Sequence, residues 1–185
     1  MPNYRRAKLP GGTYFLTQVT HHRQPWLITD IARLALRAAI THVRQKYPFT
    51  IDAFVLLPDH FHCLWTLPEG DSDLSTRLRL IKTFVTKRYG SELEINADIS
   101  TSRQKRQERN LWQIRFWEHL IRDDRDFGKH CDYIHYNPVR HRLCSVPQDW
   151  KFSTIHRLMA GGVYPPNWGM GENAKRNNYC LWYHR

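Results

Sequence analysis

Hydrophobic residues recur along the chain in two patterns, one typical of strands and one typical of helices. Runs rich in β-branched and aromatic residues, bounded by turn residues, predict strands. The predicted strands are residues 13–20, 51–57, 61–67 and a shorter one within 112–121. Apolar positions spaced by three and four residues after a capping side chain predict helices. The predicted helices run from Thr29 or Asp30 to about Tyr47, from Asp73 to about Tyr89, and from about Asp124 to Tyr136.

Each predicted helix has a side whose residues are expected to face the core. On the first helix these residues are Ile31, Leu34, Ala35, Ala38 and Ala39, and on the second they are Leu74, Leu78, Ile81 and Val85. The third helix carries two neighbouring stripes, because residues three and four apart lie on the same side. Its apolar stripe is Phe127, Cys131 and Ile134, and its polar stripe is Asp126, His130, Tyr133 and Asn137. Pro138 is expected to end this helix.

The order of these elements is β-α-β-β-α-β followed by one more helix. This is the ferredoxin-like plan, in which helices cover one face of an antiparallel sheet. We therefore predict an α+β fold with an added C-terminal helix that carries Tyr133. Residues 1–160 are expected to form one domain, with a flexible basic loop at 91–110 and a tail at 161–185.

The run from Ala53 to Leu67, which spans the second and third predicted strands, contains His60-Phe61-His62. Side chains along a strand alternate between faces, so both histidines project from one face and Phe61 from the other. Two imidazoles leave coordination positions open for a third protein group, water and substrate, as in a catalytic metal site. The alternative is that both are ordinary core or surface residues. From the tripeptide alone, that alternative is favoured.

The third helix provides candidate partners for the histidine pair. Tyr133 can present a nucleophilic hydroxyl, and Asn137, one turn later, can provide a third metal ligand through its side-chain oxygen. Alternatively, Tyr133 lies at the boundary between helix and sheet with its hydroxyl in water. Tyr136 is a second candidate nucleophile, and His135 is expected to lie on the surface.

Composition agrees with a nucleic-acid partner. The chain has 28 Lys and Arg against 17 Asp and Glu, a formal charge of +11 and a pI of about 9.8, which attracts polyanions. Aromatic residues make up 13% and offer stacking surfaces for bases. There is neither an apolar run of about 18 residues nor a signal-peptide core, so a cytoplasmic protein without membrane contact is expected. The four cysteines form no Cys-x-x-Cys pair and are expected to be reduced, with Cys63 and Cys131 buried.

Several ordered motifs resemble one known family. They are Asn3-Tyr4-Arg5-Arg6, the run from Leu57 to Gly70 around the two histidines, Arg115-Phe116-Trp117-Glu118-His119, Asp132-Tyr133-Ile134, Asn137-Pro138-Val139 and Trp150-Lys151-Phe152-Ser153-Thr154. This pattern is similar to that of the REP-associated tyrosine transposases, in the single-tyrosine branch of the HUH nucleases. The resemblance runs from about residue 3 to residue 157.

The resemblance implies a ferredoxin-like fold and a mechanism. In such enzymes a divalent metal, Mg²⁺ or Mn²⁺, polarises the scissile phosphate of single-stranded DNA, and the tyrosine attacks the phosphorus. The products are a 5′-phosphotyrosine and a free 3′-OH, so no nucleotide cofactor is needed. Carried over residue by residue, His60, His62 and Asn137 correspond to metal ligands and Tyr133 to the nucleophile. Relatives often have Gln where this chain has Asn137.

The family also acts near short palindromic hairpins, which implies a single-stranded DNA partner with a hairpin and a bacterial, nucleoid-associated protein. The candidate DNA contacts are Asn3, Tyr4, Arg5, Arg6, Arg79, Lys82, Lys87 and Arg115. Both a monomer and a homodimer fit the resemblance. A binding module without catalysis, derived from a transposase, is the alternative function. A phosphohydrolase using water is disfavoured, because Asp59 is the one carboxylate near the histidines in sequence.

Overall fold

A computed structural model describes residues 8–93 and 111–170. Within these residues, four strands form one antiparallel sheet in the order β2-β3-β1-β4. The strands are β1 (Thr13–Val19), β2 (Thr50–Leu56), β3 (His60–Thr66) and β4 (Trp117–Leu120). The longer helices are α1 (Asp30–Lys46), α2 (Leu74–Tyr89) and α4 (Asp124–Arg140). The short elements are η1 (His21–Arg23), η2 (Pro147–Asp149) and α5 (Ile155–Ala160).

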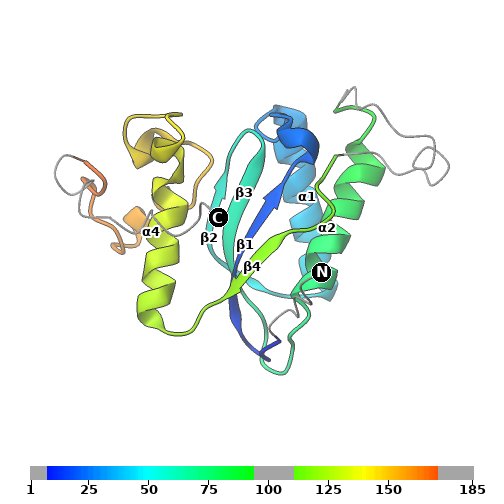
Figure 1. Cartoon of the computed structure of the whole chain (residues 1–185), viewed down its shortest axis with the longest axis horizontal. Helices are drawn as coiled ribbons and strands as arrows, with labels where there is room; N and C mark the ends of the chain where they lie inside the picture. Colours follow the sequence, from blue (N-terminus) through cyan, green and yellow to red (C-terminus); the bar gives the residue numbers. More distant parts are fainter. Residues whose placement is uncertain (1–7, 94–110, 171–185) are drawn as a thin grey trace, which may run out of the picture.

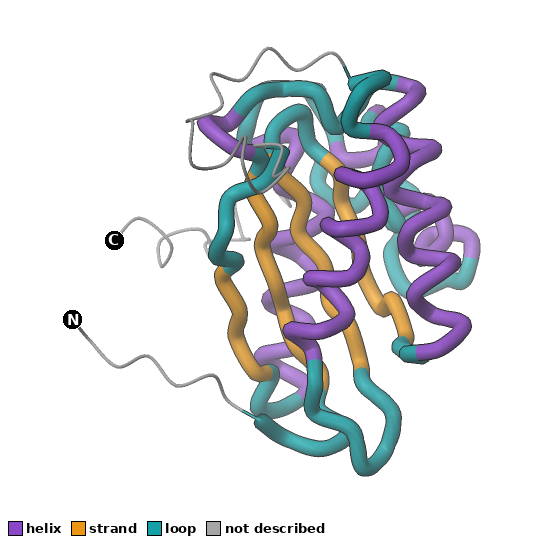
Figure 2. The backbone as a smooth tube through the Cα atoms, turned by 90° about the vertical axis from the view of Figure 1, so that its right-hand side faces the viewer, coloured by secondary structure: helices purple, strands orange, loops and turns teal. Residues whose placement is uncertain are grey.

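The elements form three layers (Figure 1). Helices α1 and α2 lie on one side of the sheet and α4 lies on the other. A view turned by 90° shows the strands side by side within this arrangement (Figure 2). The predicted α+β, ferredoxin-like fold with an added helix is thereby confirmed.

The main core lies between the sheet and helices α1 and α2. Alternate strand residues such as Leu16, Phe61 and Trp65 point into it, as the period of two requires. Helix α2 begins after Asp73, whose side chain accepts a hydrogen bond from the Thr76 backbone N–H. The four apolar residues predicted to face inward from α2 are all buried.

Helix α1 is rotated relative to the prediction. Ile31 and Leu34 are exposed, Leu34 to 65%. The buried residues are instead Ala32, Ala35, Leu36, Ala39 and Val43. The small alanines face the core and allow close packing there, so the two larger side chains near the N-terminus turn toward solvent. The prediction for Ile31 and Leu34 was wrong, whereas Ala35 and Ala39 are buried as predicted.

The second core lies between the sheet and α4. Phe15, Val55 and Leu64 pack from the strands against Cys131 and Ile134 of α4. This confirms the apolar stripe predicted for the helix. Because His60, His62 and Leu64 alternate with Phe61 along β3, the two histidines share this face with the tyrosine-bearing helix.

Helix α4 continues past the proline predicted to end it. Pro138 lies inside the helix, which ends at Arg140. Pro138 has no N–H to donate to the carbonyl of Ile134, yet the next turn is closed because the His141 N–H donates to the Asn137 carbonyl at 3.0 Å. The additional residues bring His141 next to the histidine pair.

A segment after α4 covers the outer edge of β2. The Leu56 N–H donates to the Phe152 carbonyl, and the Thr154 N–H donates to the Phe54 carbonyl, both at 2.9 Å. The Trp150 indole N–H donates to the Leu56 carbonyl at 2.9 Å. These bonds satisfy polar groups that an open sheet edge would leave exposed. In the described part of the chain, none of the helices is long and apolar enough to cross a membrane.

Candidate active site

His60 and His62 form a close pair on the α4 face of β3. Their ring centroids are 4.8 Å apart, and each residue is only 5% exposed. A buried polar group needs a partner, or its desolvation is uncompensated. The ring nitrogens of both histidines therefore need partners.

One nitrogen of each ring is held by a neighbouring side chain. Thr17 Oγ1, on β1 directly opposite His62, lies 2.7 Å from His62 Nδ1. Asp59 Oδ1 lies 2.6 Å from His60 Nδ1. Asp59 is itself fixed by Arg23, whose guanidinium donates to Asp59 Oδ2 at 2.9 Å. When Nδ1 donates to such an oxygen, Nε2 keeps its lone pair, which is the usual arrangement behind a metal-binding histidine.

Tyr133 of α4 lies directly against this pair. Its ring centroid is 5.2 Å from that of His62, and the Arg140 guanidinium lies 5.8 Å above the tyrosine ring. Tyr136, the other tyrosine considered as a nucleophile, packs against Trp168 with centroids 6.2 Å apart. The two tyrosines therefore have different surroundings, and Tyr133 is the one beside the histidines.

Asn137 lies between Tyr133 of α4 and His141, the residue that follows α4, and both contact the pair. Tyr133, four residues earlier, contacts His62, and His141, four residues later, has its ring centroid 5.2 Å from that of His60. Residues four apart share one side of a helix, so Asn137 faces the same region. It is 1% exposed, and neither its Oδ1 nor its Nδ2 has a hydrogen-bond partner among the described residues.

His62 Nε2 is likewise buried without a hydrogen-bond partner among residues 8–93 and 111–170. Native structures rarely leave several polar atoms unsatisfied in one place unless a ligand, ion or water completes them. An imidazole nitrogen and an amide oxygen are both suitable donors to a divalent cation. The residues therefore fit a metal bound by His60, His62 and Asn137.

The surroundings of His62 and His141 favour the neutral imidazole. Burial, followed by the nearby His60 and His141, holds the pKa of His62 well below its ordinary value. Burial also lowers the pKa of His141, with His60 adding to the effect. Burial of Asp59 would raise its pKa, but hydrogen bonds and charge from His60 and Arg23 outweigh this and lower it to about 2. A neutral His62 ring, with an ionised Asp59 carboxylate behind the neighbouring His60, is suited to a cation site.

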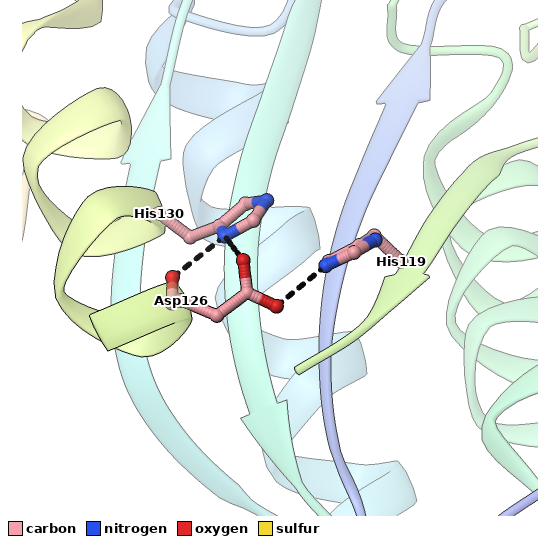
Figure 3. A group of neighbouring side chains, drawn as sticks. All are labelled: His119, Asp126 and His130. Carbon is pink, nitrogen blue, oxygen red and sulfur yellow. Dashed lines mark hydrogen bonds and ion pairs between the residues drawn. The ribbon is translucent and has the colours of Figure 1, made fainter. Parts of the chain in front are cut away.

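A second group of polar side chains lies between β4 and the first two turns of α4 (Figure 3). His119 of β4, Asp126 and His130 bring candidate ligand atoms within 4.8 Å of one another. Their atoms are already engaged: His119 Nε2 lies 2.8 Å from Asp126 Oδ2, and the Arg122 guanidinium donates to the same oxygen at 3.1 Å. A cation here would have to displace these donors and would face the positive charge of Arg122. The bonds within this group therefore favour a hydrogen-bonded network over a metal site.

The predicted DNA contacts within the described residues are not gathered at this site. Asn3, Tyr4, Arg5 and Arg6 lie outside the described residues, as does most of the 91–110 loop and the end of the tail. Arg79 and Lys87 are exposed on α2, across the sheet from the histidines, while Arg115 is exposed just before β4. The Lys82 ammonium donates to Gln18 and to the carbonyls of Gln113 and Ile114.

Other features were not predicted from the sequence. His135, expected on the surface, is fully buried, with Nε2 3.0 Å from Thr154 Oγ1. That prediction was wrong because the segment after α4 folds back over this side of the helix. Thr17 contacts His62 because of strand register, and His141 contacts His60 because of the length of α4. No local sequence pattern marks either residue as a neighbour of the histidine pair. Asp59 could have been identified as a partner of His60 from the Asp-His dipeptide.

Comparison with known proteins identifies the family. The family model described as "Transposase IS200 like" matches residues 10–137, a range that contains both histidines, Tyr133 and Asn137. An Escherichia coli K12 protein named "REP-associated tyrosine transposase" is 44% identical over 168 residues, which cover 91% of this chain and 91% of that protein. The chain belongs to the REP-associated tyrosine transposases.

Further relatives extend the comparison across nearly the whole chain. A Haemophilus influenzae protein named "Putative REP-associated tyrosine transposase" is 41% identical over 175 residues, covering 95% of this chain and 97% of that protein. A solved structure of a REP-associated tyrosine transposase bound to a REP hairpin superposes with a TM-score of 0.76 at 42% identity. The match covers 94% of this chain and 93% of that one. The resemblance inferred from the motifs is confirmed.

Proposed function

We propose that this REP-associated tyrosine transposase is a metal-dependent endonuclease and strand transferase acting on single-stranded DNA near short palindromic hairpins. The observation that carries the proposal is the placement of Tyr133 beside His62, with the two ring centroids 5.2 Å apart. Two buried candidate metal-ligand atoms lie in this region, His62 Nε2 and Asn137 Oδ1, and both lack hydrogen-bond partners among the described residues. A nucleophile and a cation site in contact are what strand cleavage by a tyrosine requires.

In the proposed step, the Tyr133 oxygen attacks the scissile phosphorus. A bond from the tyrosine oxygen to phosphorus forms as the bond from phosphorus to the 3′ oxygen breaks. The 3′ oxygen takes up a proton, the phenolic proton is lost to solvent, and the DNA 5′ end stays attached to the protein. Attack by the free 3′-OH of a strand reverses the step and rejoins DNA without an energy cofactor.

Tyr133 needs assistance, because a phenol with an ordinary pKa of ~10 is protonated near neutral pH. Arg140, 5.8 Å from the centre of the tyrosine ring, provides positive charge that favours the phenolate. Phe15, with its ring 5.7 Å from that of Tyr133, limits how the side chain can turn. These neighbours restrict the orientation of the Tyr133 ring beside His62.

His60, His62 and Asn137 would hold the divalent metal, Mg²⁺ or Mn²⁺. When bound, such an ion polarises a phosphate oxygen and offsets the charge that develops during attack. Asp59 and Thr17 act behind the ligands, keeping each ring oriented with Nε2 toward the site. The network of His119, Asp126 and His130 is the alternative location for a cation.

Hairpin DNA is the proposed substrate because of the protein's positive net charge and its similarity to a hairpin-bound relative. The net charge of +11 favours a polyanion, and the relative of similar structure is bound to a REP hairpin. Arg79, Lys87 and Arg115 are exposed cations that remain predicted contacts. Lys82 also remains one, although its ammonium already donates to three oxygens.

Covalent trapping tests the proposal. The protein is incubated with Mg²⁺ or Mn²⁺ and labelled hairpin oligonucleotides taken from sequence flanking its own gene. We expect an adduct that survives denaturation, disappears with chelator and is absent for Tyr133→Phe. Tyr136→Phe is the matched control, because it removes a hydroxyl from the same helix away from the histidines, and it should keep the adduct.

The alternative is a module that binds hairpins without cleaving them. Tight binding with no adduct from any flanking hairpin, and no change on Tyr133→Phe, would favour that module over the enzyme.

A further inference from the structure

We propose that Trp117 is a stacking platform for a base of the single-stranded substrate next to the scissile phosphate. The inference rests on the proposed function and adds a residue that positions the strand. Trp117 begins β4 and is 42% exposed, although it is a large aromatic side chain on the same face as the catalytic residues. A partly exposed indole is the kind of surface on which an unpaired base stacks.

Strand register places Trp117 in line with His62. Thr17 of β1 is paired with His62 on one side and with Trp117 on the other. The three residues therefore form one row across the sheet, and its ends are about 10 Å apart at the usual strand spacing. A nucleotide strand crossing the sheet along this row meets the histidine pair and then the indole.

Phe15 joins the two ends of this row beneath the surface. Its ring centroid is 5.5 Å from that of His62, 5.7 Å from that of Tyr133 and 5.5 Å from that of Trp117. Phe15 is itself 1% exposed. One buried ring thus separates the nucleophile from Trp117, which makes Trp117 an exposed apolar surface immediately beside the candidate active site.

The platform is held in place before any substrate arrives. The ring of Trp117 is nearly parallel to that of His119, at 6° and 6.2 Å between centroids, and His119 stacks on His130 at 4.7 Å. Asp126 fixes His119 through a 2.8 Å bond to its Nε2. This gives the network in Figure 3 a function without a metal, because it orients the ring next to Trp117.

Positive charge lies on both sides of the proposed platform along the chain. Arg115 is exposed two residues before Trp117, and the Arg122 side chain is 73% exposed five residues after it. Phosphates on either side of a stacked base can meet these guanidinium groups. An aromatic ring between cations is the usual composition of a single-strand binding surface.

The test is a double substitution cycle between protein and DNA. Binding of a hairpin with a single-stranded flank is measured by fluorescence anisotropy in chelator, which prevents cleavage, and abasic sites are introduced one position at a time. We expect Trp117→Leu to weaken binding of the intact oligonucleotide about tenfold. We expect one abasic position to cause a similar loss in the natural protein and no further loss in Trp117→Leu.

Two control variants separate stacking from folding. Trp117→Tyr keeps an aromatic ring and should bind within about threefold of the natural protein. Ile114→Ala, at a residue 78% exposed three positions earlier, should not change binding. Equal affinity of Trp117→Leu and the natural protein, or the absence of any coupled abasic position, would overturn the proposal.

The abasic scan on the natural protein keeps the test decisive if Trp117→Leu does not fold. In that case, a loss at one position near the cleavage site supports the platform, and a flat profile refutes it. Failure of the platform is distinguishable from failure of the enzyme, because the covalent adduct with Tyr133 is measured separately and does not depend on this coupling.

Discussion

Removing the hydroxyl that supports His62 should weaken metal binding. Thr17→Val keeps the size and branching of the side chain but removes the oxygen 2.7 Å from His62 Nδ1. The His62 ring can then rotate or place its proton on Nε2, the atom that would bind the metal. His60 keeps its own support from Asp59, so the site should be impaired and not lost.

The size of the effect follows from the number of supports removed. Loss of one such supporting residue typically reduces metal affinity by about 10- to 100-fold, or about 1.4 to 2.7 kcal/mol. One of the two histidine supports is removed here, and the Asn137 ligand is unchanged. Because His62 is already neutral near pH 7, with its pKa lowered mainly by burial, the loss reflects ring orientation and not a change of charge.

Isothermal titration with Mn²⁺ measures this affinity directly and does not require DNA. Thr13→Val is the matched control, since Thr13 lies on the same strand and also makes a 2.7 Å hydroxyl bond, to Thr66, but does not contact the histidine pair. Thr13→Val should bind Mn²⁺ like the natural protein.

An affinity for Thr17→Val within twofold of the natural value would refute this reasoning. If His119→Gln removes Mn²⁺ binding while Thr17→Val leaves it intact, the ion is bound by the network of His119, Asp126 and His130 instead.

Three further predictions concern stability, each measured by urea unfolding. Leu78→Ala on α2 should lower the free energy of unfolding by about 2–5 kcal/mol, because Leu78 is fully buried. Leu34→Ala on α1 should change it by less than about 0.5 kcal/mol, because Leu34 is exposed. Similar losses for the two variants would contradict the exposure of Leu34. Burial lowers the pKa of His135 to about 4. The stability that the neutral His135 ring contributes is therefore complete above its ordinary pKa of ~6.5 and is lost as the pH falls toward 4. Between about pH 7.5 and about pH 5 the loss should be about 2 kcal/mol, and a His135→Gln protein with the same pH dependence as the natural one would disprove it. Thr154→Val should cost about 1–3 kcal/mol, because the Phe54 N–H loses the hydroxyl that accepts its 2.8 Å bond; unchanged stability would contradict that role.

Local patterns predicted most of the elements and which candidate residues share a face. Alternation along β3 places His60 and His62 on one face, and the spacing of Tyr133 and Asn137 places them on one side of α4. Both inferences require only the period of a strand or helix. The combination of motifs suggested that the tyrosine helix lies near the histidine strand. In the structure α4 packs on the face of the sheet that carries both histidines.

Features that depend on other parts of the chain could not be predicted in this way. Leu34 is apolar at a helical spacing, yet the alanines of α1 occupy the contact with the core, so its exposure depends on the packing partner. His135 is buried by a segment nearly twenty residues later. Thr17 reaches His62 only through strand register, and a proline usually ends a helix, although α4 continues through Pro138.

The attachments of α4 limit how the tyrosine helix can move. Near its beginning, Asp126 is bonded to His119 on β4; near its end, His135 is bonded to Thr154, which is also bonded to β2. The helix is therefore anchored to β4 and β2, the two outer strands of the sheet in the same chain, and Tyr133 lies between the two anchors. Exchanging this helix with a second subunit would require both anchors to break, and a rigid-body swing of the helix during strand transfer would meet the same resistance. In the proposed reaction, the DNA end linked to Tyr133 would stay beside the histidines, so the incoming strand would have to travel to the tyrosine.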